Sequence, residues 1–188
     1  MTEPDTLVRI LVLGGIRSGK SQWAEANIAE IAGSPDDAAA VRYLATGPIA
    51  ASDAEWSARV DAHRRRRPAS WSTVETADIA KQLRSDDVTA TIVDDIGGWL
   101  TAAMDRTNAW TGGSVSDDVD DLVDAVGSFG SALALVSPEV GLTVVPATES
   151  GRRFADELGT LNQRLAQVCD RVVLVVAGQP VTVKDSGT

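Results

Sequence analysis

The chain has 188 residues, of which 44% are hydrophobic, and a formal net charge of −10. We expect one domain over residues 1–188, with residues 1–6 and 185–188 as flexible ends. The acidic charge disfavours nucleic acid and anionic membranes as partners, and no apolar run is long enough for membrane insertion. One cysteine, Cys169, and one histidine, His63, exclude an internal disulfide and a thiol–imidazole metal cluster. The polar start lacks signal-peptide order, so we expect a cytoplasmic protein.

Short apolar runs rich in β-branched residues alternate with helical patterns along the chain. Strands are expected at residues 7–13, 41–45, 91–93, 133–136 and 172–176. Helices are expected at residues 21–32, 52–67, 77–84, 99–106, 118–132 and 148–169, and loops at 33–39, 107–117 and after Gly178. Continuous apolar strands separated by helices predict an α/β fold, a P-loop NTPase-type three-layer sandwich with a largely parallel central sheet.

A phosphate-binding loop is indicated by the segment Gly14-Gly15-Ile16-Arg17-Ser18-Gly19-Lys20-Ser21, which has the spacing G-x-x-x-x-G-K-S. Its glycines allow the backbone to wrap a phosphate with successive N–H groups pointing inward. Lys20 would neutralise the β- and γ-phosphate oxygens, and Ser21 would ligate Mg²⁺. The expected strand before the segment and helix after it are the context that this motif requires, which disfavours an accidental match.

A carboxylate follows the expected strand at residues 91–93, where P-loop enzymes carry the group that orders Mg²⁺. Asp94 is our candidate for this role, and the adjacent Asp95 competes with it. The alternative is that the carboxylate only caps the helical segment that begins near residue 97.

His63 is followed directly by four arginines, Arg64 to Arg67, and three interpretations stay open. The run could bind nucleic acid, although the net charge and the absence of interleaved aromatic residues speak against this. It could be the solvated end of a helix, where the helix dipole favours cations. In the third interpretation, the surrounding cations keep the imidazole neutral, so that it acts as a nucleophile beside phosphate-binding groups.

The sequence resembles the family of bifunctional adenosylcobinamide kinase/adenosylcobinamide-phosphate guanylyltransferases of vitamin B12 assembly, over about residues 9–184. The phosphate loop carries an Arg17-Ser18 pair that a generic loop does not require. The family pattern R-x-x-x-H-x-x-x-R-P-x-x-W-x-T-x-E is matched, after Ala45-Thr46-Gly47, by Arg59, His63, Arg67-Pro68, Trp71, Thr73 and Glu75. Further similar segments are Asp94 with Trp99, a helix with Arg152, Phe154, Asp156, Gly159, Asn162 and Gln163, and a closing strand with Gly178, Pro180 and Lys184.

Three positions depart from the family pattern. Pro138 replaces the asparagine of an N-E-V-G segment, Gly97 replaces a usual threonine, and Ala102 stands where asparagine is common. A proline removes a side-chain amide and a backbone N–H from what we expect to be a loop near the active site. We therefore expect an effect on substrate orientation rather than on nucleotide binding.

The resemblance implies two reactions. The γ-phosphoryl group of ATP or GTP passes to adenosylcobinamide, and His63 then takes GMP from GTP and transfers it to adenosylcobinamide phosphate, giving adenosylcobinamide-GDP. It also implies a homo-oligomer, a trimer. A plain small-molecule kinase and a non-enzymatic nucleotide-sensing module are the alternatives. The implied catalytic residues are His63 and Lys20, the Mg²⁺ ligands are Ser21 and Asp94, and the nucleotide-binding residues are Gly14 to Ser21, Thr46, Gly47, Arg67, Glu75 and Asp94.

Overall fold

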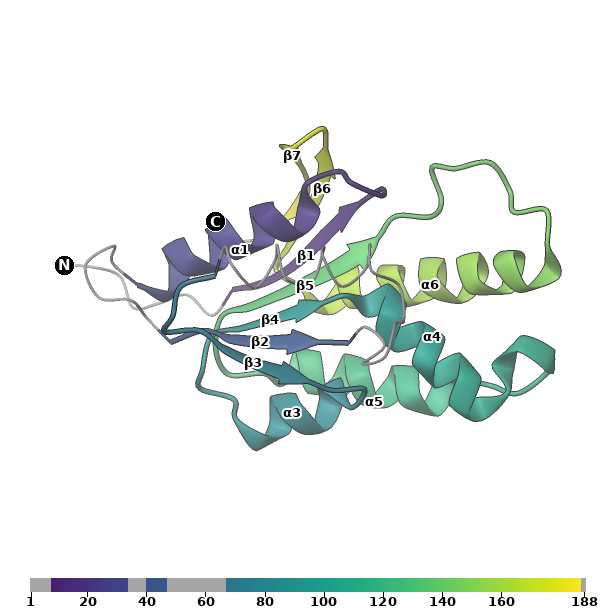
Figure 1. Ribbon diagram of the computed structural model, residues 1–188, viewed down its shortest axis with the longest axis horizontal. Helices are drawn as coiled ribbons and strands as arrows, with labels where there is room; N and C mark the ends of the chain where they lie inside the picture. Colours follow the sequence, from purple (N-terminus) through teal and green to yellow (C-terminus); the bar gives the residue numbers. More distant parts are fainter. Residues whose placement is uncertain (1–7, 34–39, 47–66, 187–188) are drawn as a thin grey trace.

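The structure is a computed structural model that describes residues 8–33, 40–46 and 67–186 (Figure 1). Its centre is a seven-stranded sheet with the order β3-β2-β4-β5-β1-β6-β7. Strands β1 to β6 run parallel to one another, and the edge strand β7 is antiparallel to β6. The expected α/β fold with a largely parallel sheet is therefore confirmed. The strands are β1 (Arg9–Gly14), β2 (Arg42–Ala45), β3 (Ser72–Glu75), β4 (Thr91–Asp94), β5 (Leu133–Pro138), β6 (Arg171–Val176) and β7 (Gln179–Asp185).

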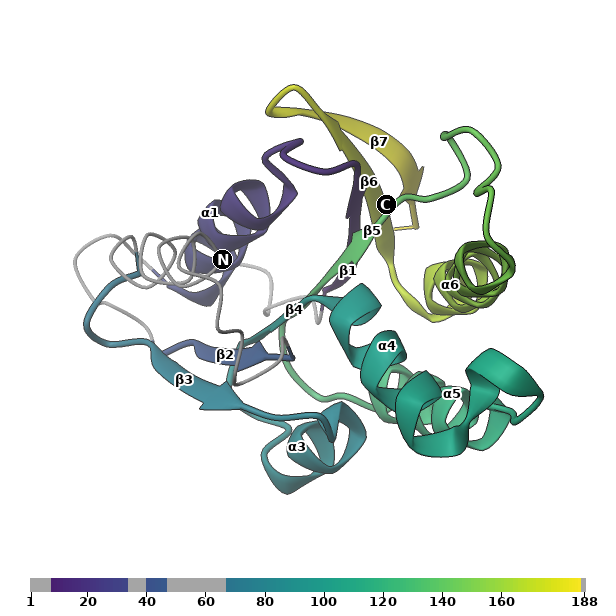
Figure 2. The same ribbon diagram turned by 45° about the vertical axis from the view of Figure 1, so that its right-hand side comes forward.

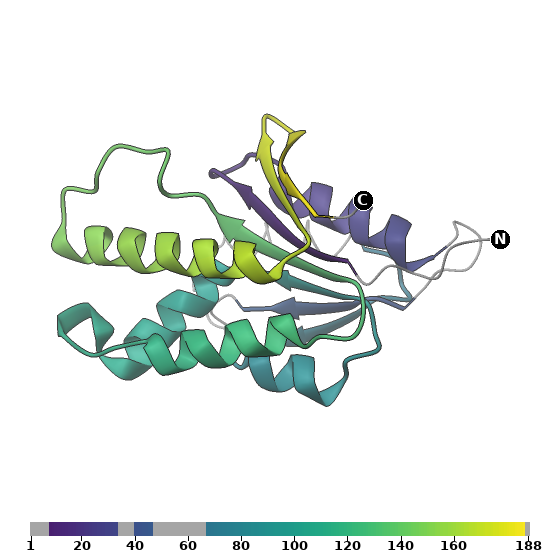
Figure 3. The same ribbon diagram turned by 180° about the vertical axis from the view of Figure 1, so that it is seen from behind.

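Helices cover both faces of the sheet, as the views in Figures 2 and 3 show. Helix α1 packs on one face, and α3, α4, α5 and α6 pack on the other. The short 3₁₀ turn η1 lies between α4 and α5. None of the helices in the described part of the chain has the length and the apolar composition needed to cross a bilayer. The helices are α1 (Lys20–Ala32), α3 (Ile79–Ser85), α4 (Ile96–Thr107), η1 (Ala109–Thr111), α5 (Ser116–Gly127) and α6 (Glu149–Val168).

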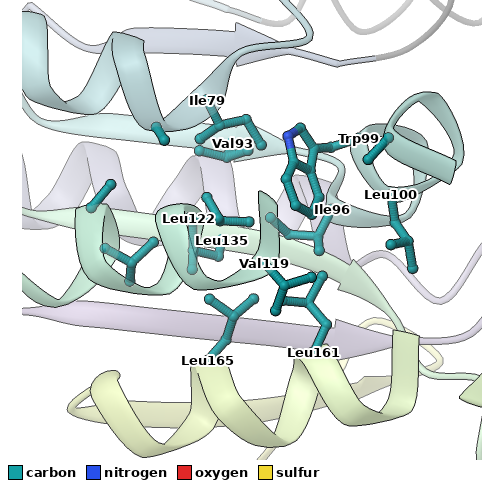
Figure 4. Close-up of a cluster of buried hydrophobic side chains, with 14 of the residues drawn as sticks. Ile79, Val93, Ile96, Trp99, Leu100, Val119, Leu122, Leu135, Leu161 and Leu165 are labelled. Carbon is teal, nitrogen blue, oxygen red and sulfur yellow. The ribbon is translucent and has the colours of Figure 1, made fainter. Parts of the chain in front are cut away.

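Two hydrophobic clusters lie on opposite faces of the sheet. Successive strand residues point to opposite faces, so Ile10 and Val12 of β1 join the cluster under α1, while Leu11 joins the larger cluster under the other helices. Figure 4 shows this larger cluster, where Leu161 and Leu165 of α6 lie close to the sheet. Burial of the strands on both faces explains why they are continuous apolar runs.

The chain after Gly178 is not the loop that we predicted from its composition. It forms the edge strand β7, as the family resemblance implied, and no residue of this strand is buried. Asp185 is the last residue of β7 and pairs with Arg171, whose Nε lies 3.6 Å from the Asp185 carboxylate. Residue 185, which we expected in a flexible end, is thus the last residue of this edge strand. Strand β7 was not predicted from its composition because an exposed edge strand does not need a continuous apolar run.

Several element boundaries also differ from the prediction. The expected loop at residues 107–117 contains η1, the end of α4 and the start of α5, and the helix expected to reach residue 132 ends at Gly127. Strand β3 was not predicted, because three of its four residues are exposed. Pro138, which we placed in a loop, is the last residue of β5. The expected helix at residues 52–67 lies outside the described residues, except for Arg67.

Candidate nucleotide-binding site

The predicted phosphate loop connects β1 to α1. The backbone N–H of Gly178 donates to the Ser18 carbonyl at 2.8 Å, and the Ser18 N–H donates to the Gly15 carbonyl at 3.3 Å. Gly19 has a φ of 91°, and a Cβ atom there would lie 3.2 Å from the Gly178 Cα. A side chain at residue 19 would therefore strain the backbone and press on the neighbouring turn. Glycine at residue 19 therefore permits the tight loop that the motif predicts.

The loop and the helix after it present features suited to an anion. Within the described residues, no side chain caps the first turn of α1, whose N-cap residue is Gly19. The N–H groups of that turn, at the positive end of the helix dipole, can therefore bind a phosphate. The Lys20 ammonium donates to the Gly15 carbonyl at 3.3 Å, so it lies beside the loop. Ile16 at the tip is 90% exposed.

Asp95, and not Asp94, caps the helix after β4. The Asp95 Oδ1 atom accepts from the Gly98 N–H at 2.6 Å, and the Asp95 carbonyl accepts from the Thr46 hydroxyl at 2.5 Å. Burial raises the pKa of Asp95 above its ordinary value and the Asp94 charge adds to this effect, whereas the Lys20 charge lowers that pKa. The carboxylate that caps the helix is therefore that of Asp95. Because the charge of Lys20 acts on its pKa, Asp95 also lies near the phosphate loop.

Asp94, the last residue of β4, accepts a hydrogen bond from a residue that sequence reasoning missed. The Tyr43 hydroxyl donates to Asp94 Oδ2 at 2.5 Å, and Tyr43 is only 2% exposed. Burial, then the Asp94 charge, raises the pKa of Tyr43. The only available signal was chemical: a buried tyrosine hydroxyl usually has a polar partner.

Arg67 lies against the same tyrosine. Its Cζ atom is 3.2 Å from the centroid of the Tyr43 ring, and its Nε atom is 3.8 Å from Glu25 Oε1. The Arg67 Nη1 also donates to the Thr73 hydroxyl at 3.1 Å. The Arg67 side chain is 8% exposed, so its described contacts are internal to the protein. A nucleotide contact of Arg67 stays a prediction.

The remaining predicted site residues fall into two groups. Thr46 follows β2, and Glu75 ends β3 in register with Ala45. Because these strands are parallel to β1 and β4, Thr46 and Glu75 lie at the same edge of the sheet as the phosphate loop and Asp94. Gly47 and His63 lie outside the described residues.

A cavity of about 540 Å³ lies between helix α6, strand β7 and residues 139–148, the segment after β5. Arg152, Asn162 and Gln163, which belong to the helix that resembles the family pattern, are among its lining residues. The Arg152 guanidinium donates to the Pro146 and Ala147 carbonyls at 3.1 and 2.8 Å. Such bonds hold the segment after β5 against α6.

Comparison with known proteins gives one consistent result. The family model described as "Cobinamide kinase / cobinamide phosphate guanyltransferase" matches residues 10–183. The bifunctional adenosylcobalamin biosynthesis protein CobP of Pseudomonas aeruginosa is 39% identical over 182 residues, which cover 94% of this chain and 98% of the relative. The bifunctional adenosylcobalamin biosynthesis proteins CobU of Salmonella typhimurium and Escherichia coli are 36% and 33% identical over 195 residues, with 93% of this chain and 99% of each relative covered.

Proposed function

We propose that this chain phosphorylates adenosylcobinamide and then transfers GMP to the product, because it belongs to the cobinamide kinase / cobinamide phosphate guanyltransferase family. The observation that carries the proposal is the complete phosphate loop, Gly14 to Ser21, set between β1 and α1 within that family match. The relatives named above are bifunctional proteins of adenosylcobalamin biosynthesis, which agrees with two reactions on one corrinoid substrate.

In the kinase step, the γ-phosphoryl group of ATP or GTP passes to the hydroxyl of adenosylcobinamide. The loop N–H groups and Lys20 would stabilise the charge that develops on the transferring group. Ser21 and Asp94 would hold Mg²⁺, which neutralises phosphate charge when it is bound. Their hydroxyl and carboxylate oxygens suit this hard cation, and the Tyr43 hydroxyl orients the Asp94 carboxylate.

Within the described residues, no group of three or more acidic, histidine or cysteine side chains could hold a metal ion. This agrees with a Mg²⁺ site made by one or two protein ligands together with phosphates and water.

In the second step, an imidazole nitrogen of His63 forms a bond to the α-phosphorus of GTP, and pyrophosphate leaves. A phosphate oxygen of adenosylcobinamide phosphate then attacks the same phosphorus and displaces the imidazole. The assignment of His63 rests on the family resemblance of the motif that contains it. A covalent intermediate divides one difficult displacement into two easier ones.

We also infer a single domain, a cytoplasmic location and a homo-oligomer, with a trimer suggested by the family resemblance. Exposed apolar side chains support self-association. Leu142, Val144 and Val145 in the segment after β5, and Val181 and Val183 in β7, are between 52% and 91% exposed. Clustered exposed apolar side chains commonly mark interaction surfaces.

A labelling experiment tests the guanylyl transfer. The protein is incubated with Mg²⁺ and GTP labelled at the α-phosphate, and acid-labile covalent label is measured in the wild type and in His63→Ala. We expect label on the wild type alone, and transfer of that label to added adenosylcobinamide phosphate. No label in either protein, despite tight GTP binding, would favour the plain kinase or the nucleotide sensor.

The kinase step is assayed separately, by following the γ-phosphate label onto adenosylcobinamide. Activity should be lost in Lys20→Ala and kept in His63→Ala. Lys81→Ala is the matched control, because it removes an equal charge from an exposed position on α3. Loss of the kinase activity in Lys81→Ala would point to a general effect of net charge instead of a role for the loop.

A further inference from the structure

Two of the three departures from the family pattern, Gly97 and Pro138, meet in the folded protein. A Cβ atom built on Gly97 would lie 2.8 Å from Cγ and 3.1 Å from Cδ of Pro138. Contacts this short require movement, and a proline ring has little freedom because it is closed onto its own backbone. The absence of a side chain at residue 97 therefore makes room for the ring at residue 138.

The backbone pattern of β5 explains why a proline is tolerated there. Leu133 and Glu139 donate their N–H groups to carbonyls on the β1 side of the strand. The donors of β5 alternate between its two neighbours, so the nitrogen of Pro138 faces the β4 side. On that side β4 ends at Asp94, which is in register with Val136. Pro138 therefore lies past the last paired residue of β4, where no ladder hydrogen bond is lost.

Pro138 is also tied to the start of the phosphate loop. It is in register with Gly14, and the N–H of the next residue, Glu139, donates to the Gly14 carbonyl at 3.1 Å. From α6, the Asn162 amide donates to the Pro138 carbonyl at 3.1 Å, and its Oδ1 accepts from the Ser137 hydroxyl at 2.6 Å. A displacement of the proline ring would therefore be transmitted to the loop.

Gly97 is tied to the opposite side of the site. It lies in the first turn of α4, which begins at Ile96 and is capped by Asp95, the residue after Asp94. The ring of Pro138 thus faces the first turn of α4, while its backbone pairs with the end of β1, which carries the phosphate loop. We propose that Gly97 and Pro138 form a matched steric pair that sets the spacing between the phosphate loop and Asp94, and so positions a Mg²⁺-bound nucleotide. This rests on the proposed roles of the loop and Asp94.

The pair predicts a specific pattern in a double-mutant cycle. Gly97→Ala introduces the short contact with Pro138, whereas Pro138→Ala opens a gap beside Gly97. In the double variant, the new methyl group at residue 97 occupies space that the ring has left. The effects of the two single substitutions should therefore not add, and each should compensate for the other in the double variant, as expected for residues in direct contact.

The measured quantity is the dissociation constant for GTP at 20 °C, with Mg²⁺ and with EDTA. In the wild type, Mg²⁺ should tighten binding, and the Mg²⁺-dependent gain is the dissociation constant in EDTA divided by that with Mg²⁺. Gly97→Ala should reduce this gain by roughly tenfold, and Pro138→Ala should reduce it by roughly threefold. In the double variant the gain should recover to within about twofold of the wild-type value. Binding in EDTA, which involves the loop without the cation, should change less.

Gly159→Ala is the control, because it adds a methyl group to a helical glycine of α6 where a Cβ would meet no atom within 4 Å. It should leave the Mg²⁺-dependent gain unchanged. Thermal unfolding of every variant separates positioning from stability. A lower unfolding temperature in Gly97→Ala with a wild-type gain from Mg²⁺ would overturn the positioning role, and so would a double variant that shows no recovery.

Two further outcomes are decisive. If Gly97→Ala does not fold, Pro138→Ala and the double variant still test the pair, since neither of them contains the short contact. A wild-type protein that binds no GTP would overturn the proposed function together with the positioning role. GTP binding with an unchanged Mg²⁺ response in the variants would overturn the positioning role alone.

Discussion

Replacing Tyr43 by phenylalanine removes a single oxygen atom from the buried contact between β2 and the end of β4. The Tyr43 hydroxyl donates to Asp94 Oδ2 at 2.5 Å, and the Arg67 guanidinium lies 3.2 Å above the Tyr43 ring. Phenylalanine retains the ring, its packing and this cation–π contact. Tyr43→Phe therefore isolates the hydrogen bond to the candidate Mg²⁺ ligand.

The size of the effect follows from the chemistry of the bond. A hydrogen bond to a charged group contributes about 1.5–3 kcal/mol, and this one is shielded from water. We expect the free energy of unfolding, measured with urea at pH 7, to fall by about 2 kcal/mol. Loss of the donor also leaves the Asp94 carboxylate less well oriented, so the Mg²⁺ concentration for half-maximal GTP binding should rise.

Two controls make the result specific. Trp71→Phe alters an aromatic residue that packs against the same core, and it should lower stability without changing the Mg²⁺ requirement. In an Asp94→Asn background, Tyr43→Phe should cost less, because hydrogen bonds to ionised partners are roughly twice as strong as neutral ones. A loss of less than about 0.5 kcal/mol with an unchanged Mg²⁺ requirement would refute the role given to Tyr43.

Other predictions concern buried ionisable groups. Asp95→Asn keeps an acceptor for the Gly98 N–H and removes a carboxylate whose pKa is raised by burial. The free energy of unfolding of Asp95→Asn should exceed that of the wild type at pH 7. Below pH 3.8, the ordinary pKa of the carboxyl group, it should not exceed the wild-type value. Asp95→Ala loses the cap and should cost about 1 kcal/mol; equal stabilities of the two variants would contradict the cap. Burial raises the pKa of the Cys169 thiol to about 12 from 9.0, so its contribution to stability is complete below pH 9 and is lost as the pH rises towards 12. As the pH rises above 9, the free energy of unfolding should fall less steeply in Cys169→Ala than in the wild type, by about 1.4 kcal/mol per pH unit. Parallel plots of this free energy against pH for the two proteins would rule this out.

The parts of the fold that sequence reasoning predicted are those with a strong apolar signal. Strands β1, β4, β5 and β6 are buried on both faces, so each is a run of apolar residues. Strands β3 and β7 lie at the two edges of the sheet and have no buried residue. Their pairing is decided by tertiary position, because an edge strand needs only one neighbour.

The site divides in the same way. The phosphate loop was predictable because its backbone requires glycines at fixed spacing. The sequence could not separate the roles of Asp94 and Asp95, because adjacent residues differ only in where the turn directs their side chains. The partner of Tyr43 could not be predicted because it depends on strand register: Tyr43 pairs with Ile92, and Asp94 is the next β4 residue on the same face.

Gly97 and Pro138 show why departures from a family pattern cannot be judged one at a time. A threonine at residue 97, as in the family pattern, would collide with the ring of Pro138. The conflict arises only when both side chains are present, so neither substitution alone returns this chain to the family arrangement. Ala102 lies farther along α4, and nothing in the structure explains this third departure. Changes toward the family pattern should therefore be made in pairs that touch, and sequence distance is no guide to which pairs those are.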